Sequence, residues 1–331
     1  MPDQLMASIS IVTYNQEHYI GETLDSMLAQ DCNFAYEIVV GEDGSTDNTR
    51  QVIEDYQQRH PGRIRLMPLA PNKGLLRNFR DTLTSCTGKY LTICAGDDYW
   101  HDPKKLQKQV DFLESNPEYG IVHTDLDFYL AKQDRYIRNF NRKNQQDIVD
   151  GEVFEALLTS RFFINALTVC FRKELLDKHV DFAQFEAAGF NYEDLPTWLE
   201  LSRHTLVKYM DESTATYRVL EDSVSRPTEV KKKFKFLQSH FVIKKYYIDR
   251  YNVDEKTRLA VEKNFHRKRF DMAYKWFAPE EGRESFAFLQ RHDEVSMKLR
   301  AKNAVLSIPI LYRAINSFKK LLIPATSVTN T

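Results

Sequence analysis

The first 130 residues alternate between short apolar runs and stretches in which apolar residues recur at helical spacing. Four runs rich in β-branched and apolar residues predict buried strands, at 8–14, 36–43, 63–69 and 89–96. Between them, apolar residues three or four positions apart predict amphipathic helices, as at Ile20, Leu24, Met27 and Leu28. Alternating strands and helices are typical of right-handed βαβ units, so we expect an α/β fold with a largely parallel sheet.

The same alternation continues after the fourth strand. Asp102 and Pro103 are the residue types of a helix N-cap and a first helical residue, so a helix is expected to begin there. The run YGIVHTDLDFY predicts a further strand after it. From about residue 228 the pattern is mainly helical, which predicts an α/β domain over 1–225 and a helical extension over 226–331.

Charge is distributed unevenly over these two parts. The net charge is −1, but residues 226–331 contain 23 Lys and Arg against 11 Asp and Glu. A basic extension after an acidic domain suggests a polyanionic partner. No nucleic-acid-binding motif accompanies the basic residues, so nucleic acid is not the expected partner.

The end of the sequence gives one candidate for that partner. Pro309 can start a helix with an apolar stripe and basic residues beside it; the stripe is Leu311, Ile315, Phe318 and Leu322. Such a helix can lie in an anionic membrane interface, or it can pack on the domain with its lysines in solvent, and the sequence leaves both open. No apolar run spans a bilayer and no signal peptide is recognisable, so we expect a cytoplasmic protein with peripheral membrane contact at most.

Two acidic pairs follow directly on predicted strands: Glu42-Asp43 after the second and Asp97-Asp98 after the fourth. In parallel α/β sheets, ligands bind outside the carboxyl ends of the strands. The alternative is that these residues only form turns or cap helices. The sequence has no GxGxxG after its first strand and no P-loop, so a bridging Mn2+ or Mg2+ is expected to hold any nucleotide phosphates against the carboxylates.

Four motifs occur in order: SIVTYNQEHYIGETLDSMLAQ, EIVVGEDGSTDNT, NKGLLRN and GDDYW. Together they resemble the family 2 glycosyltransferases of the GT-A fold, strongly over 1–130 and more weakly to about 225. The resemblance implies a Rossmann-like, mostly parallel central sheet flanked by helices, followed here by the helical extension. It also implies a catalytic role for the first domain.

The resemblance implies roles for residues around the nucleotide. Thr13, Asn15 and Glu17 match the loop around the base and ribose, and Asp43 matches the aspartate that binds the uracil ring. The nucleotide pocket is completed by the matches to the third motif, Lys73, Arg77 and Asn78.

The remaining roles concern metal and catalysis. Asp98 matches the metal ligand, and Asp97 matches the residue that faces the ribose or donor sugar. In NYEDLPTWLELSRH, Asp194 matches the general base and Glu193 its orienting neighbour, although both can also simply cap a helix. The stretch YRVLEDSVS resembles a segment that closes over the diphosphate, with Leu220 where the family usually has histidine and Arg218 as a compensating cation.

The resemblance implies an inverting, metal-dependent glycosyltransferase that uses a UDP-sugar carrying a hexose or N-acetylhexosamine. The resemblance and the basic extension together imply a saccharide linked to a polyisoprenyl diphosphate as the acceptor, in lipopolysaccharide O-antigen or capsule biosynthesis. Two alternatives remain: a non-catalytic nucleotide-sugar-binding subunit of a glycosyltransferase complex, and an enzyme that uses a dTDP-, GDP- or CDP-sugar.

Overall fold

The computed structural model describes residues 5–143, 149–220 and 229–314 of the chain. The chain forms two compact units, Met1–Arg226 and Pro227–Thr331. The residues on either side of the predicted boundary at 225 lie outside the described part. Of the helix predicted from Pro309, residues 309–314 are described and helical, whereas Ile315, Phe318 and Leu322 lie outside it.

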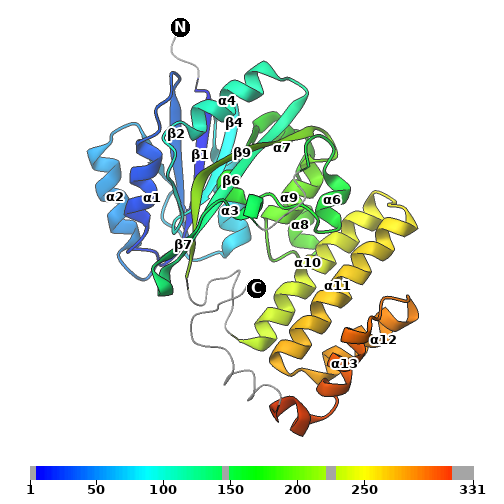
Figure 1. The fold of residues 1–331 in the computed structure, drawn as a ribbon. Helices are drawn as coiled ribbons and strands as arrows, with labels where there is room; N and C mark the ends of the chain where they lie inside the picture. Colours follow the sequence, from blue (N-terminus) through cyan, green and yellow to red (C-terminus); the bar gives the residue numbers. More distant parts are fainter. Residues whose placement is uncertain (1–4, 144–148, 221–228, 315–331) are drawn as a thin grey trace. The chain divides into compact units, whose positions relative to one another are not determined.

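The first unit is built on one sheet with the strand order β3-β2-β1-β4-β8-β6-β9-β5, and β7 pairs with β6 (Figure 1). Strands β3, β2, β1 and β4 are parallel, as predicted, and β6 is parallel to β9. Between β4 and β6 lies β8, which is antiparallel to both. The strands are β1 (Ala7–Thr13), β2 (Tyr36–Glu42), β3 (Ile64–Leu66), β4 (Tyr90–Ala95), β5 (Tyr99–Trp100), β6 (Tyr119–Leu130), β7 (Arg135–Ile137), β8 (Cys170–Arg172) and β9 (Leu206–Val219).

Helices cover both faces of this sheet. The alternate residues Ile9 and Ile11 of β1 share one core with α1, α2 and α4. On the other face, Phe79 of α3 meets Phe182 of α8, with ring centroids 6.0 Å apart. The helices are α1 (Ile20–Leu28), α2 (Thr49–Arg59), α3 (Leu75–Ser85), α4 (Lys105–Ser115), α5 (Phe140–Lys143), α6 (Phe154–Leu158), α7 (Lys173–His179), α8 (Phe182–Ala187) and α9 (Asp194–Leu201), with short 3-10 turns at Ala131–Gln133 and Ala166–Thr168.

Helix α4 begins later than its sequence predicts. Its first residue is Lys105, with Lys104 at the N-cap position, so the prediction that Asp102 caps a helix starting at Pro103 is wrong by two residues. The Asp102 carboxylate instead accepts the N–H of Lys104 at 2.8 Å. This local hydrogen bond forms a turn of the kind in which aspartate competes with helix formation.

The second unit is helical, with α10 (Val230–Arg250), α11 (Glu255–Trp276), α12 (Pro279–Arg291) and α13 (Met297–Leu306). Asp254 caps α11, because its carboxylate accepts the N–H of Thr257 at 3.0 Å. The unit has its own core, formed by Phe270, Ala273, Leu289, Leu299 and Leu306. Within the described residues, none of the helices combines the length and apolarity needed to cross a bilayer.

Candidate functional site

The two acidic pairs lie at the same edge of the sheet. Thr13 at the end of β1 is level with Glu42 on β2, and its neighbour Val12 is level with Ala95 on β4. Strands β2 and β4 lie on either side of β1. Asp43 follows β2, and the pair Asp97-Asp98 follows β4. At the usual strand spacing, these two strand ends are about 10 Å apart. The strand order thus brings the predicted base-binding and metal-binding carboxylates to one edge.

The turn that carries Asp97 and Asp98 is tied to helix α1. The Thr23 hydroxyl lies 2.9 Å from the carbonyl oxygen of Gly96 and 2.7 Å from that of Asp98. Thr23 is buried within the otherwise apolar stripe of α1, between Ile20 and Met27. Because Thr23 is a polar residue among the apolar positions of α1, the sequence pattern could have identified it as a contact to the aspartate turn.

Arg218 of β9 holds the same turn from the other side. Its backbone N–H donates to the Asp98 carboxylate at 2.7 Å, and its guanidinium donates to the Asp97 carbonyl oxygen at 2.7 Å. The guanidinium also forms an ion pair with Glu22 in the first turn of α1. The side chain that was expected to grip phosphate is thus engaged in positioning the aspartate pair. Glu22 is a member of this site that the sequence motifs did not reveal.

Electrostatics make the aspartate pair a place for a cation. Asp98 is only 3% exposed. Burial, and next the charge of Asp97, raise the pKa of Asp98 well above its usual range, and burial also raises the pKa of Asp97. Both carboxylates therefore remain costly to ionise even with the Arg218 guanidinium nearby, and a bound cation would offset that cost.

The donor set at this turn fits a divalent ion that is completed by a substrate. Among the described residues there is no group of three or more His, Cys, Asp or Glu that could enclose a metal. Mg2+ and similar hard ions are commonly held by one or two carboxylates together with substrate phosphates and waters. Asp98, with Asp97 beside it, is the candidate ligand.

Asp43 uses both carboxylate oxygens to order the loop before α3. Oδ1 accepts the N–H of Lys73 at 2.9 Å, and Oδ2 accepts the N–H of Gly74 at 3.0 Å. Gly74 has φ +85°, a left-handed conformation that favours glycine. Each carboxylate oxygen still has a second lone pair for another donor. Asp43 can therefore bind a ligand while it holds this loop.

The other residues of the third motif are also engaged. Lys73 forms an ion pair with Asp81 at 2.7 Å, and Arg77 forms a longer one, at 3.3 Å, with a glutamate of α8. The side-chain amide of Asn78 is buried and donates to the carbonyl oxygen of Gly41 at 2.7 Å. Asn78 thus fixes α3 to the end of β2.

The predicted base-and-ribose loop is joined to the loop after β2. Asn15 accepts the N–H of Thr46 at 2.8 Å, and Glu17 accepts the N–H of Asn48 at 2.9 Å. Thr13 is buried at the end of β1. These contacts place all three residues at the same edge as Asp43 and order the two loops against each other.

Glu193 and Asp194 lie at the start of α9. This helix ends shortly before β9 begins at Leu206, which is level with Tyr119 at the amino end of β6. The C-terminal end of α9 therefore lies near the amino edge of the sheet. Trp198 of the same helix contacts Phe171 of β8, with ring centroids 5.6 Å apart.

The two carboxyl groups of this pair have different surroundings. Glu193 is at the N-cap position but makes no side-chain cap hydrogen bond, and its buried Oε2 has no hydrogen-bond partner. Burial, and next the charge of Asp194, raise the pKa of Glu193 to about 8. Asp194 accepts the N–H of Leu195 at 2.6 Å. Helix capping therefore does not explain the presence of Glu193.

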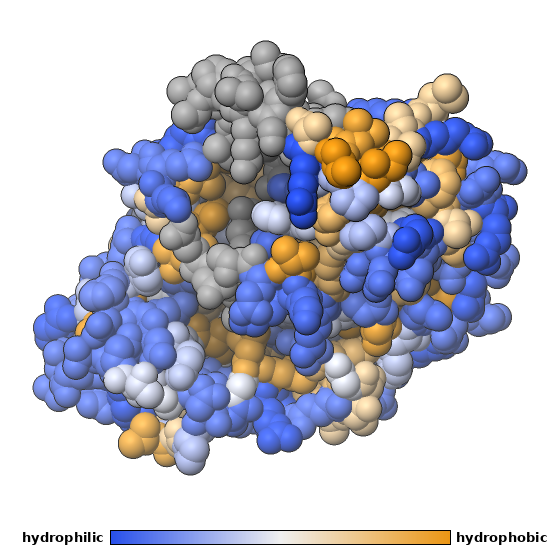
Figure 2. All heavy atoms as spheres, turned by 90° about the horizontal axis from the view of Figure 1, so that it is seen from below, coloured by the Kyte–Doolittle hydropathy of each residue, from blue (hydrophilic) through white to orange (hydrophobic). Residues whose placement is uncertain are grey.

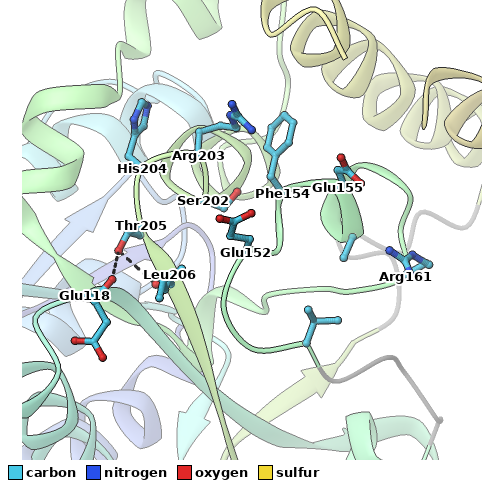
Figure 3. A pocket seen from close by; sticks show the side chains of 12 residues that line it. Glu118, Glu152, Phe154, Glu155, Arg161, Ser202, Arg203, His204, Thr205 and Leu206 are labelled. Atoms are coloured by element: carbon cyan, nitrogen blue, oxygen red, sulfur yellow. Dashed lines mark hydrogen bonds between the residues drawn. The ribbon is translucent and has the colours of Figure 1, made fainter. Parts of the chain in front are cut away.

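A cavity of about 780 Å³ opens at the other edge of the sheet, near the amino ends of β6 and β9 (Figure 3). Side chains of both charges surround it, among them Glu152 and Arg203. On one side of the cavity, the Thr205 hydroxyl donates a hydrogen bond to the carbonyl oxygen of Glu118 at 3.3 Å. None of the predicted site residues lines this cavity, so it is separate from the candidate site.

Comparison with known families identifies a match. The model of the family described as glycosyl transferase family 2 matches residues 8–177. An uncharacterized protein of Mycobacterium tuberculosis is 45% identical over 114 residues, which are 34% of this chain and 33% of that protein. The chain thus matches only about a third of the length of that relative. TuaG of Bacillus subtilis, whose name assigns it as a glycosyltransferase to teichuronic acid biosynthesis, is 27% identical over 222 residues, 66% of this chain and 81% of TuaG.

Solved structures share the fold. TarS 1–349 of S. aureus in complex with UDP-GlcNAc superimposes with a TM-score of 0.57 and 16% identity, over 98% of this chain and 95% of TarS 1–349. The mannosyltransferase PcManGT of Pyrobaculum calidifontis, in complex with GDP-Man and Mn2+, gives a TM-score of 0.55 and 18% identity, over 96% of this chain and 85% of that one. The expected α/β fold with a C-terminal helical part is thereby confirmed.

Proposed function

Because the chain belongs to glycosyl transferase family 2, as its four motifs predicted, we propose that it transfers a sugar from a UDP-sugar to a saccharide acceptor. The transferred sugar is a hexose or N-acetylhexosamine, and the reaction inverts the anomeric centre and depends on a divalent metal. One observation carries this proposal: the Asp97-Asp98 turn, in which Asp98 is buried, lies at the same sheet edge as Asp43.

Asp43 supports uracil as the base. Its oxygens already accept two backbone N–H groups and keep lone pairs for one more donor, such as the N3–H of uracil. The UDP-GlcNAc complex of TarS, which has the same fold, supports this donor class, and the GDP-Man complex of PcManGT makes GDP-sugars the alternative to test. The nucleotide is bordered by five residues from three segments: Thr13 at the end of β1, Asn15 and Glu17 in the loop after it, and Lys73 and Arg77 before and within the first turn of α3.

Asp98, with Asp97 beside it, holds Mn2+ or Mg2+. A bound ion supplies Lewis-acid neutralisation of the diphosphate leaving group. Arg218 fixes both aspartates in place before the donor arrives, so little reorganisation is needed on binding.

Asp194 acts as the general base that removes the proton from the attacking acceptor hydroxyl. Glu193 retains its own proton at neutral pH, because burial raises its pKa to about 8, and it can donate a hydrogen bond to the donor sugar. Two neighbouring carboxyl groups in different surroundings are a common arrangement for separate acid and base roles.

The acceptor is a saccharide linked to a polyisoprenyl diphosphate, and the second unit binds the membrane that contains it. Hydrophobic side chains form groups among hydrophilic ones on the face drawn in Figure 2. In the second unit, Met297 and Ile310 are 83% and 82% exposed, and Ile308 is half exposed. No Asp or Glu follows Glu294 in the sequence, whereas six Lys and Arg do. Exposed apolar residues with basic ones are typical of peripheral binding to anionic bilayers.

Vesicle sedimentation tests this membrane contact. The full chain should bind vesicles that contain phosphatidylglycerol and should not bind vesicles of phosphatidylcholine alone. The double variant Met297→Ser and Ile310→Ser should lose binding, whereas Val242→Ser, at an exposed apolar residue of α10, should retain it. Equal binding by both variants would exclude this surface.

The transfer reaction is tested by UDP release from a panel of UDP-sugars with Mn2+, with and without a lipid-linked acceptor. Asp98→Asn should lower the rate about 1,000-fold, since it removes several kcal/mol of charge stabilisation. Asp194→Asn should lower it about 100- to 10,000-fold. Asp111→Asn, on the exposed side of α4, is the matched control and should behave as the wild type.

The same assay separates the enzyme from a non-catalytic binding subunit. A binding subunit would show a thermal shift with UDP-sugars and would release no UDP with any acceptor. Surface polysaccharides such as O-antigen and capsule are the biological setting that we propose; the name of TuaG, with its teichuronic acid assignment, adds a further polymer class for the acceptor panel.

A further inference from the structure

Three tyrosines lie on one face of the sheet beside the aspartate turn. Tyr129 on β6 is level with Tyr136 on β7 and with Arg218 on β9, and Tyr99 on β5 is level with Thr216 on β9. Paired residues in a sheet, and residues two apart in a strand, point to the same face. Tyr99, Tyr129 and Tyr136 therefore share the face from which Arg218 reaches the aspartate pair. We call these three residues the tyrosine face.

The hydrophobic core does not account for this face. The neighbouring residues of the same strands, Phe128 and Tyr217, point the other way, with ring centroids 5.2 Å apart, and they pack in the core with Ile137. Tyr136, by contrast, is 39% exposed. At this end of the sheet the strands thus carry aromatic residues on both faces, and those of the tyrosine face are not part of the core that contains Phe128.

Contacts within the tyrosine face hold its rings in position. The hydroxyl oxygens of Tyr99 and Tyr136 are 2.9 Å apart, and the rings of Tyr129 and Tyr136 are 4.8 Å apart at their centroids. Arg138 stacks on Tyr136 at 4.0 Å and is itself paired with Asp127 at 2.5 Å. Ordered aromatic rings with hydroxyl groups offer contact area and hydrogen bonds at a small entropic cost.

We propose that the tyrosine face binds the pyranose ring of the acceptor saccharide. The location of the tyrosine face supports the acceptor over the donor. Across the sheet, Asp43 follows β2 and the aspartate turn follows β4, whereas the tyrosines lie on β5, β6 and β7. The tyrosines are thus on the side of the aspartate turn that is away from the proposed base site. Tyr99 directly follows Asp98 in the chain, so the face begins beside the reacting centre. Planar phenol rings suit the apolar faces of a pyranose, while the phenol hydroxyls and Arg138 suit its hydroxyl groups. This inference rests on the proposed function.

The test measures glycoside binding directly, by saturation-transfer NMR on the full chain with UDP and Mn2+ present. The probes are octyl glycosides of glucose, galactose, mannose and N-acetylglucosamine. We expect at least one to bind the wild type, Tyr136→Ala to weaken that binding about tenfold, and Tyr136→Phe to weaken it less, because the ring remains. Gln133→Ala, on the same hairpin, is the matched control and should bind as the wild type.

Three results would overturn the proposal: no glycoside binds the wild type, Tyr136→Ala binds as tightly as Gln133→Ala, or Tyr136→Ala weakens a UDP-sugar relative to UDP and leaves the glycosides unchanged. The last result would assign the face to the donor sugar. Equal circular dichroism spectra and melting temperatures for the variants establish that they are folded. UDP-sugar binding by the wild type is measured separately by thermal shift. Its absence would reject the proposed function, whereas donor binding without an effect of Tyr136 would reject only the tyrosine face.

Discussion

Replacing Glu193 by glutamine should stabilise the protein, and the gain should increase with pH. The pKa of Glu193 is raised from 4.5 to about 8 by burial and by Asp194. A carboxyl group whose pKa is higher in the folded state costs no stability at low pH, and it becomes destabilising as the pH rises from 4.5 toward 8, because the unfolded chain ionises first. Glutamine has the same shape and no such ionisation.

The pKa difference gives the size of the effect. Each unit corresponds to about 1.4 kcal/mol, so the wild type loses on the order of 4 kcal/mol at pH 8 and about 1 kcal/mol at pH 5. The advantage of Glu193→Gln should therefore increase by about 3 kcal/mol between these pH values. For a unit of this size, that corresponds to roughly 6–12 °C in melting temperature.

Thermal unfolding between pH 5 and pH 8, followed by tryptophan fluorescence, measures this difference. Glu118→Gln, at an exposed glutamate, is the control and should give a nearly constant difference. If Glu193→Gln and the wild type differ by the same amount at every pH, Glu193 is not a buried, protonated carboxyl group. The reasoning from its unpartnered Oε2 would then be refuted.

Three further predictions concern other buried polar groups. Arg218→Lys should lower the free energy of unfolding by about 2 kcal/mol and raise the Mn2+ concentration needed for half-maximal activity, because a lysine ammonium cannot reach the Asp97 carbonyl oxygen and the Glu22 carboxylate at the same time. Urea unfolding measures the first effect and metal titration the second. Asp43→Asn should cost about 1–3 kcal/mol and weaken UDP binding in calorimetry, because one backbone N–H of the 73–74 loop would face an amide NH2 group; unchanged UDP affinity would remove Asp43 from the base site. Burial lowers the pKa of Lys244 to about 7, so Lys244→Met should stabilise the protein most below pH 7, and the gain should disappear as the pH rises toward 10; urea midpoints across this range test the sign.

The sequence predicts the part of the sheet formed by the first four alternating strand and helix segments, where the hydrophobic pattern of each segment is clear. Alternating strands and helices predict parallel β1, β2, β3 and β4, and strand ends in such a sheet predict where Asp43 and Asp98 lie. Strand β8 was missed because its three residues are too few to show a period, and it enters the sheet antiparallel. The start of α4 was misplaced because the side chain of Asp102 closes a turn before it can cap the helix.

The site contacts that the sequence did not predict join distant parts of the chain. Arg218 binds the aspartate turn across 120 residues, and the amide of Asn78 binds Gly41 across 37. The sequence motifs point to both residues, but the bonding partner of each depends on strand order, which the sequence does not show. Tyr136 belongs to a hairpin whose turn contains a left-handed Asp134, with φ 46°, in place of the usual glycine, so nothing in the pattern marked it.

The turn between β6 and β7 is the exposed part of this hairpin, whereas Ile137 of β7 packs against the core. Strand β7 lies off the main path of the sheet and is attached through β6, and its residues Arg135 and Tyr136 face solvent. Insertions or grafts at the exposed turn residues 132–134 are therefore expected to leave the interior and the carboxylates at the sheet edge unchanged. Under the acceptor role proposed above for the tyrosine face, such grafts would change the acceptor and leave the proposed donor site unchanged.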